Sequence, residues 1–285
     1  AKKADIGIEG KFLNNKLEFT VDFFQDRRDG IYQQRTQIPD YAGLATMPYG
    51  NVGKMISYGS DGNISYTHDF NKDWTWTVRG NFTYSANKVE NWEQPDQPYD
   101  YQNYSGYVHN AFRGYVSLGL FRDEVDVKQS PRQTFGEYTV GDIKYKDVNA
   151  DGIVDDDDKV PLSYPNYPRL MYGFASELRW KDLSLGVMFK GTGNTDYYYV
   201  NGTTNGEGYI PFYNGATGNV LTIVANDKNR WIPESYSGTK ATENPNALFP
   251  RLSYGKNSNN TQYSTFWKAN SRYLRLQEVN VNYRV

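Results

Sequence analysis

Cysteine is absent from this chain of 285 residues, and other features that commonly indicate a function are scarce. Without cysteine the chain has no disulfide, no thiolate nucleophile and no cysteine-bound zinc. Its two histidines lack the spacing of a metal-binding pair on a helix. The 31 basic and 33 acidic residues nearly cancel, so no basic surface for nucleic acid is expected. The sequence therefore predicts neither an enzyme nor a nucleic-acid-binding protein.

Long hydrophobic runs are missing too, and the mean hydropathy is −0.78, which excludes a transmembrane helix. A strand that spans a membrane carries its hydrophobicity in every second residue, so a barrel of such strands has a polar average. Aromatic residues are plentiful, at 16% of the chain with 26 Tyr and 6 Trp. This content suits the two aromatic girdles of a membrane barrel, and it also suits a carbohydrate-binding protein.

The segment 74–85, WTWTVRGNFTYS, alternates strictly between apolar and polar positions. Successive strand residues point to opposite sides, so the segment is a two-faced ribbon about as long as a membrane-spanning strand. Its aromatic residues fall at both ends of the apolar face, where the headgroups of a bilayer would lie.

Alternation returns in six further segments, at about 5–12, 16–23, 63–70, 172–180, 183–189 and 273–285. Short turns and long connections alternate between them, and we place the long ones at about 26–53, 89–168 and 200–271. Outer-membrane barrels have this order, with short periplasmic turns and longer extracellular loops. The predicted fold is therefore all-β, an antiparallel transmembrane β-barrel.

Two features of the strands lead to further predictions, a β-bulge and additional strands. In the last segment Leu274 is out of phase with Val279, which predicts a β-bulge near Gln277 or Glu278. Seven strands cannot close a wide barrel, and an open sheet edge is not tolerated in lipid. Further strands are therefore expected outside this chain.

The segment 147–158, DVNADGIVDDDD, matches the calcium-binding loop of EF-hand proteins. The expected ligands are Asp147, Asn149, Asp151, the Ile153 carbonyl, Asp155 and Asp158. Gly152 falls where the template requires a sharp backbone turn. The loop departs from the template in ending with Asp instead of Glu and in having no flanking amphipathic helices. We expect an isolated structural Ca²⁺ site, and the alternative is an acidic solvated turn.

Aromatic residues in the long connections are candidates for ligand binding, namely Trp92, Tyr101, Tyr104 and Trp231. Sugars stack on aromatic rings, and peptides use the same rings as anchors. The alternative is that these rings pack the loops against one another or against a partner.

Four segments resemble SusC/RagA-type TonB-dependent transporters: NVGK at 51–54, GDIKYKDVNADGIVDDDDKV at 141–160, YPNYPRLMYGF at 164–174 and RYLRLQEVNVNYRV at 272–285. The resemblance covers nearly the whole chain. Its most specific parts are the calcium-like loop with its flanks and the final strand.

Such a resemblance implies a 22-stranded barrel in the bacterial cell outer membrane with an N-terminal plug domain. It implies a SusD-like surface lipoprotein as partner and energy from the inner-membrane TonB–ExbB–ExbD complex. Residues 1–285 would be the C-terminal portion of the barrel domain, without the plug and the last strands. The implied function is active import of oligosaccharides or peptides, by a dimer of transporter–lipoprotein pairs.

Two other functions stay open on the sequence. One is a secreted, calcium-stabilised β-rich module that binds or hydrolyses carbohydrate, and it would be soluble and monomeric without detergent. The other is a surface adhesin or passive porin, which would need neither a plug nor an energy source.

Overall fold

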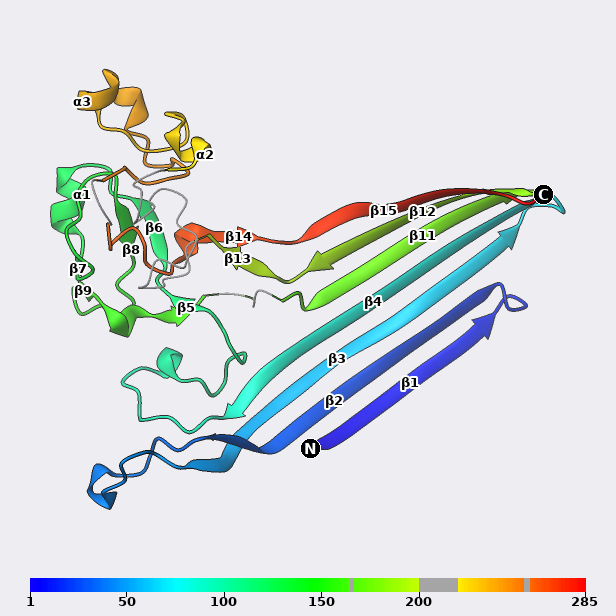
Figure 1. Cartoon of the computed structure of the whole chain (residues 1–285), viewed down its shortest axis with the longest axis horizontal. Coiled ribbons are helices and arrows are strands. Elements are labelled where there is room, and N and C mark those ends of the chain that lie inside the picture. Colours follow the sequence, from blue (N-terminus) through cyan, green and yellow to red (C-terminus); the bar gives the residue numbers. More distant parts are fainter. Residues whose placement is uncertain (163, 165–166, 200–219, 254–256) are drawn as a thin grey trace.

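The computed structural model describes residues 1–285 except 163, 165–166, 200–219 and 254–256. Seven long strands form one antiparallel sheet in the order β1–β2–β3–β4–β11–β12–β15 (Figure 1). Their bounds are β1 Lys2–Phe12, β2 Leu17–Gln34, β3 Tyr49–Asp69, β4 Trp74–Asn91, β11 Leu170–Trp180, β12 Leu183–Gly193 and β15 Tyr273–Tyr283. Long strands that follow one another in the sequence are neighbours in the sheet, so it is a meander of hairpins.

The short turns and the long connections lie at opposite ends of this sheet (Figure 1). The turns are 13–16, 70–73 and 181–182. In the first, Leu13, Asn14 and Asn15 all have positive φ, near 60°, and Asn tolerates this conformation better than most residues. In the second, the Asn71 side chain accepts hydrogen bonds from the backbone N–H of Asp73. The predicted order of short and long connections is thus confirmed.

The first long connection is shorter than the predicted 26–53. Strands β2 and β3 stay paired out to Gln34 and Tyr49, which leaves only 35–48 between them. The polar run before Gly30 suggests a turn, but the register shifts next to Gly30, whose φ is +70°, and pairing then resumes. In the third connection, 200–219 lies outside the described residues.

The connections at the other end fold together into what we call the loop cap, the described residues of 92–169 and 194–272. It contains the short helices α1 Glu124–Gln129, α2 Thr222–Ala225 and α3 Glu234–Ser237. Its short strands are β5 Arg113–Gly114, β6 Ser117–Leu120, β7 Arg132–Gln133, β8 Ile143–Tyr145, β9 Ile153–Val154, β10 Val160–Pro161, β13 Asp196–Tyr198 and β14 Lys268–Asn270. Strands β13 and β14 pair with each other and continue β12 and β15 into the cap.

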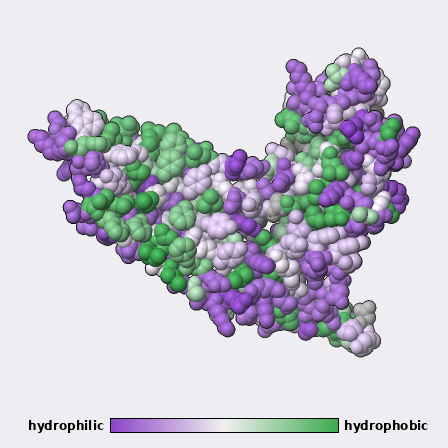
Figure 2. Space-filling view, turned by 180° about the vertical axis from the view of Figure 1, so that it is seen from behind, coloured by the Kyte–Doolittle hydropathy of each residue, from purple (hydrophilic) through white to green (hydrophobic). Residues whose placement is uncertain are grey.

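The hydrophobic core lies in the loop cap and not against the sheet. Its buried members are Tyr115, Leu120, Ile143, Tyr145, Val154, Val224, Trp231, Ala247 and Trp267. On the sheet, by contrast, large apolar side chains are exposed, for example Ile6 at 68% and Val281 at 66%. Hydrophobic side chains gather over the sheet in Figure 2, while the surface of the cap is largely hydrophilic. Contiguous exposed apolar surface of this kind indicates contact with a membrane or another protein.

Within the described ranges, no helix is long and apolar enough to cross a membrane.

Candidate functional site

The two faces of the sheet have opposite chemical character, and the pairing register keeps them separate. Val78 of β4 lies opposite Ser176 of β11, which lies opposite Val187 of β12 and then Val279 of β15. The next row carries Arg79, Ala175, Met188 and Glu278 on the other face. A slip of one residue between two strands would mix the faces, so the apolar pattern itself specifies the register.

A bulge in β15 preserves this separation. Met188 is paired with Glu278 but Phe189 with Leu276, so Gln277 has no partner of its own across the strand. The extra residue returns Leu276 and Leu274 to the apolar face. The bulge predicted near Gln277 or Glu278 is therefore confirmed.

Stacked aromatic rings lie at the short-turn end and near the middle of the apolar face. At the short-turn end Trp74 and Trp180 stack with ring centroids 5.9 Å apart. Nearer the loop cap Phe174 stacks on Phe189 at 4.8 Å. The Trp76 indole N–H donates to the Ser176 hydroxyl at 2.9 Å, so each of these two polar groups has a hydrogen-bond partner on the apolar face. Trp74 and Trp180 thus lie where a membrane-spanning sheet would carry one of its interfacial girdles, while Phe174 and Phe189 lie midway along β11 and β12.

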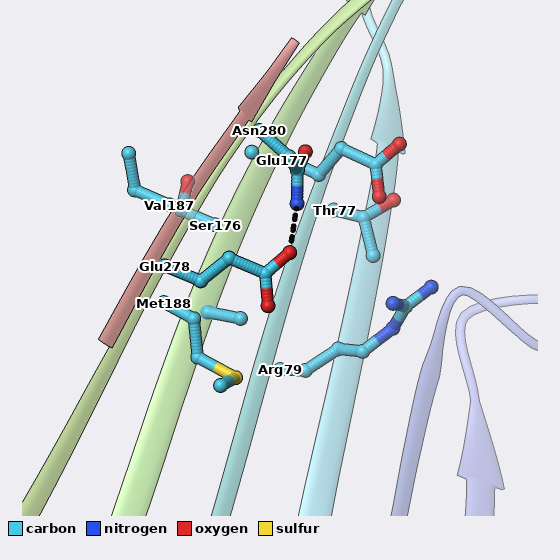
Figure 3. Close-up of a pocket in the computed structure, with 10 residues that line it drawn as sticks. Thr77, Arg79, Ser176, Glu177, Val187, Met188, Glu278 and Asn280 are labelled. Carbon is cyan, nitrogen blue, oxygen red and sulfur yellow. Dashed lines mark hydrogen bonds between the residues drawn. The ribbon is translucent and has the colours of Figure 1, made fainter. Parts of the chain in front are cut away.

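The polar face has a hollow that residues of β4, β11, β12 and β15 line (Figure 3). Arg79, Glu177, Met188, Glu278 and Asn280 surround this hollow. The Asn280 side chain donates to the Glu278 carboxylate at 2.9 Å. Arg79 forms no ion pair with any described residue. This wall offers both signs of charge and amide groups to the space in front of it, which suits a polar occupant.

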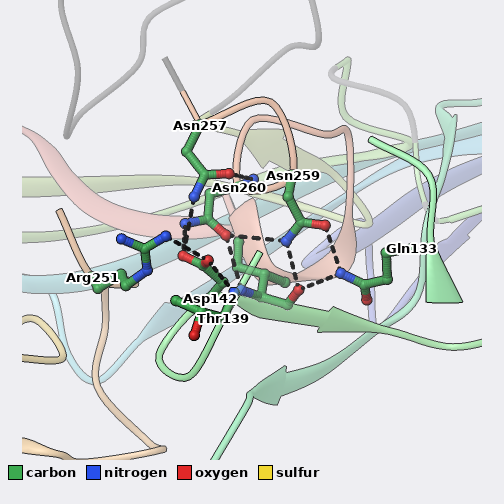
Figure 4. Close-up of polar contacts among 8 residues, drawn as sticks. Gln133, Thr139, Asp142, Arg251, Asn257, Asn259 and Asn260 are labelled. Atoms are coloured by element: carbon green, nitrogen blue, oxygen red, sulfur yellow. Dashed lines mark hydrogen bonds and ion pairs between the residues drawn. The ribbon is translucent and has the colours of Figure 1, made fainter. Parts of the chain in front are cut away.

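A buried polar network joins the two long connections within the loop cap (Figure 4). At its centre Asp142 is fully buried. One of its oxygens accepts from the Thr139 N–H at 2.8 Å and from Arg251 at 2.9 Å, and the other from Asn257 at 3.1 Å and Asn260 at 2.7 Å. Burial raises the pKa of Asp142, and the Arg251 guanidinium opposes that rise.

Side-chain amides extend this network along β8. The Ile143 N–H donates to the Asn260 side-chain oxygen at 2.9 Å, and the Ile143 carbonyl accepts from Asn259 at 2.9 Å. Gln133 donates to the same carbonyl at 3.0 Å and accepts from the Tyr145 N–H. These amides make the hydrogen bonds that a neighbouring strand would otherwise make. The buried N–H and C=O groups of Ile143 and the N–H of Tyr145 therefore have partners. Sequence reasoning missed the network, because NSNN at 257–260 looks like ordinary loop sequence.

In the acidic loop 147–158, side-chain carboxylates accept hydrogen bonds from backbone N–H groups of the same loop. Asp147 accepts from the N–H groups of Ala150 at 2.6 Å and Gly152 at 2.8 Å, and Gly152 has φ +88° as the template turn requires. The buried Asp158 accepts from Val148 at 2.6 Å and Asp155 at 2.9 Å.

The other predicted ligands follow the same pattern. Asn149 accepts from the Asp151 N–H, Asp151 from the Ile153 N–H, and Asp155 from the Asp157 N–H. In the part of the chain that the structure describes, no group of three or more acidic or histidine side chains is placed to hold a metal ion. The predicted side-chain ligands therefore share one loop and accept hydrogen bonds from its backbone N–H groups, and the Asn149 side chain also donates to the Tyr99 hydroxyl and to Asp151.

Three of the four aromatic ligand candidates lie in the second long connection, 92–169. The Tyr101 hydroxyl donates to the Asp157 carbonyl at 2.7 Å, and burial raises the pKa of Tyr101 to about 12. Tyr104 is 52% exposed, and the Arg113 guanidinium lies 5.0 Å from its ring. Trp92 lies against the His109 ring at 5.8 Å. Tyr104 thus offers the most open ring for a ligand, while Tyr101 fixes the connection to the acidic loop.

Trp231, the fourth candidate, is a core residue. It is 4% exposed and belongs to the buried cluster of the cap. A Cβ atom added at Gly141 would lie 2.3 Å from its ring, so the indole rests directly on the backbone there. Burial removes Trp231 from the set of rings that a ligand could reach, because the indole is needed to fill the space between the two connections.

Another buried carboxylate, Asp126 of α1, joins this helix to β8. Lys144 donates to it at 2.8 Å and the Arg122 N–H at 3.1 Å. Burial by itself raises the pKa of Asp126, but these donors outweigh burial and hold it at about 2.

We expect acid to weaken the loop cap through this group. The unfolded pKa of Asp is about 3.9, so the unfolded state binds more protons between about pH 4 and pH 2. The stabilisation, about 2 kcal/mol, is complete above that window and is lost as the pH falls through it. This loss of stability can be measured by hydrogen exchange of cap amides from pH 2 to pH 6, in the wild type and in Asp126→Asn. Equal slopes against pH in the two proteins would contradict the assignment.

Comparisons with known proteins agree with this architecture. No protein-family model matches the chain. TonB-dependent receptor P26 of Formosa agariphila is 23% identical over 291 residues, which cover 99% of this chain and 27% of that protein. TonB-dependent receptor SusC of Bacteroides thetaiotaomicron is 21% identical over 204 residues, which cover 68% of this chain and 19% of SusC.

Solved structures give the same result for the fold. The RagAB peptide importer in its open-open state superposes with a TM-score of 0.66 and 20% identity, over 99% of this chain and 28% of that one. The chain spans less than a third of the length of each of these relatives. The relatives are named as receptors and importers, not as enzymes. This chain is therefore similar in sequence to TonB-dependent receptors, a class of proteins of the bacterial outer membrane, and it shares its fold with a section of the RagAB peptide importer.

Proposed function

We propose that this chain forms part of the wall and the extracellular cap of an outer-membrane importer for oligosaccharides or peptides. The observation that carries the proposal is the apolar face, which runs in register across all seven strands while charged and amide side chains share the other face. Apolar side chains toward lipid and polar ones toward a lumen are what transport of a polar solute through a membrane requires.

In this proposal the sheet is one section of a closed barrel of 22 strands, and other strands of the protein pair with β1 and β15. Each of these two strands has one neighbour among the described residues. Unpaired N–H and C=O groups in lipid cost several kcal/mol each, so closure is required on physical grounds. A plug domain in the lumen would contact the polar face, including the hollow beside Arg79.

The proposed partners are a SusD-like surface lipoprotein on the loop cap and the TonB–ExbB–ExbD complex, which would supply energy through other regions of the protein. The proposed assembly is a dimer of transporter–lipoprotein pairs. Similarity to SusC and to the RagAB peptide importer supports these partners and leaves both substrate classes as candidates.

Two measurements test the proposal on the full-length protein. Spin labels at Val78, Phe82 and Val187 should report lipid, and labels at the neighbouring Arg79 and Asn81 should report an aqueous lumen. A cryo-EM map of the protein purified from outer membranes should show this sheet within a barrel that carries a plug and a lipoprotein. A detergent-free, soluble protein with water at all five labels would instead support a secreted β-rich module.

The loop 147–158 is the proposed site of a structural Ca²⁺ ion. Its expected ligand atoms are all oxygens, which Ca²⁺ prefers. A carboxylate that accepts a hydrogen bond from an N–H group keeps further lone pairs that can bind a cation. The ion would compensate the negative charge of Asp147, Asp151, Asp155 and Asp158, which all belong to this one loop.

Removal of calcium should therefore destabilise the cap. At a free concentration 100-fold above Kd, the ion would stabilise the protein by about 2.7 kcal/mol. EDTA should lower the Tm of the wild type, and Asp147→Ala with Asp151→Ala should have a low Tm that EDTA does not change. The matched control is Glu124→Ala with Glu137→Ala, two exposed acids of the same cap. An unchanged wild-type Tm in EDTA would show that the loop is only an acidic turn.

A further inference from the structure

A second cavity lies where the barrel sheet meets the loop cap, away from the hollow beside Arg79. Its volume is about 310 Å³, and its lining residues are Leu162, Tyr164, Arg169, Asp196 and Lys268. They come from three segments: the connection before β11, the start of β13 and the start of β14. The cavity exists only because both long connections return to the sheet at the same place.

The charged groups of this cavity are not paired with one another. Arg169 and Lys268 are cations and Asp196 is an acid, yet no two of them approach within the 4.0 Å of an ion pair. Asp196 is 6% exposed, and one of its oxygens accepts from the Tyr164 N–H at 3.3 Å. The Arg169 guanidinium lies 5.1 Å from the Tyr164 ring, a cation–π contact that leaves its N–H groups for another acceptor.

Arg169 is held in place on both sides by backbone. Its N–H donates to the Asn194 carbonyl at 3.3 Å, and its carbonyl accepts from the Ser85 N–H at 2.8 Å. Arg169 precedes Leu170, which belongs to the apolar face, so Arg169 belongs to the polar face. These bonds fix the backbone of Arg169, and the contact with the Tyr164 ring orders its guanidinium, so the side chain loses less freedom when it binds a ligand.

The geometry points to a carboxylate-binding subsite at this junction, formed by Arg169 and Lys268, for one end of an imported substrate. The inference rests on the proposed import function, in which the polar face lines the lumen. Two cations and one acid leave one net positive charge, which complements a monoanion such as a carboxylate. The buried Asp196 can accept a hydrogen bond from an N–H or hydroxyl beside that carboxylate, and it disfavours a dianionic phosphate.

Such a carboxylate has two sources among the proposed substrates, the C-terminus of a peptide and a uronate of an acidic glycan. The test measures binding to the full-length protein in detergent by calorimetry. The probes are a mixture of N-acetylated pentapeptides as free acids or as C-terminal amides, and tetragalacturonate or its methyl ester. We expect the wild type to bind at least one free acid about 10- to 100-fold more tightly than its neutral form.

The double variant Arg169→Gln with Lys268→Gln should lose this preference. The matched control is Arg132→Gln with Lys240→Gln, which removes two exposed cap cations without ion pairs among the described residues. The control should bind as the wild type does. Preference for the peptide acid would identify a peptide terminus, and preference for tetragalacturonate would identify an acidic glycan.

Two results would overturn the subsite: no preference for either acid in the wild type, or the same preference in the double variant. Neither result affects the spin-label test of membrane orientation, which uses residues on strands away from this cavity. Failure of the subsite can therefore be distinguished from failure of the importer assignment.

Discussion

Replacing Asp142 with alanine should lower the local stability of the loop cap by about 3–5 kcal/mol, because it leaves buried donors without an acceptor. Arg251 would keep a partly buried charge, and the amides of Asn257 and Asn260 would keep N–H groups cut off from water. The free energy of local opening, measured by native-state hydrogen exchange on the full-length protein, reports this change. Faster exchange is expected in both connections at once, near 133–145 and near 257–267.

Two controls separate this network from a general effect of mutation. Glu137→Ala removes an exposed acid from the same connection and should change cap stability by less than about 0.5 kcal/mol. Arg251→Ala combined with Asp142→Ala should cost less than the sum of the single changes, since the two side chains form one ion pair. Exchange that rises in only one connection would show that Asp142 does not join the two.

Arginine at position 187 should destabilise the membrane-embedded protein by about 2–4 kcal/mol, whereas arginine at the adjacent position 188 should have little effect. Val187 lies midway along the apolar face between Ser176 and Val279. Met188 lies on the polar face opposite Glu278, so an arginine there meets an acid and water.

The pair is well matched, since both substitutions replace an apolar residue of β12 with the same cation. Urea unfolding of the full-length protein refolded into lipid vesicles measures the difference. Equal destabilisation by both variants would mean that the two faces do not meet different solvents. Destabilisation by Met188→Arg alone would mean that the polar face is the buried one.

Much of the sheet could be predicted from the sequence, because strand periodicity is a local property. Alternation with a period of two places Trp74 and Tyr84 on one face whatever their neighbours are, and seven such segments predict a two-faced sheet. The phase break between Leu274 and Val279 predicted the bulge for the same reason. The ends of β2 and β3 were harder to place, because Gly30 resembles a turn and only the partner strand shows that pairing continues.

The cap could not be predicted in this way, because its contacts join residues far apart in the chain. Asp142 meets Asn260 at 2.7 Å across 118 positions, and no local pattern marks either residue. Trp231 illustrates the same limit, since an aromatic residue in a polar connection fits a ligand platform and a core equally well. Its burial depends on Gly141, which leaves the space that the indole fills.

The sequence by itself determined the two-faced strands, the order of short turns and long connections, and the resemblance to an outer-membrane transporter family. Each of these is encoded in periodicity or in contiguous motifs. Only the tertiary structure decided that the long connections share one core, that Asp142 is their common acceptor, and that Arg169, Asp196 and Lys268 line one cavity. The physical reason is that desolvation and hydrogen-bond satisfaction depend on what surrounds a group in space.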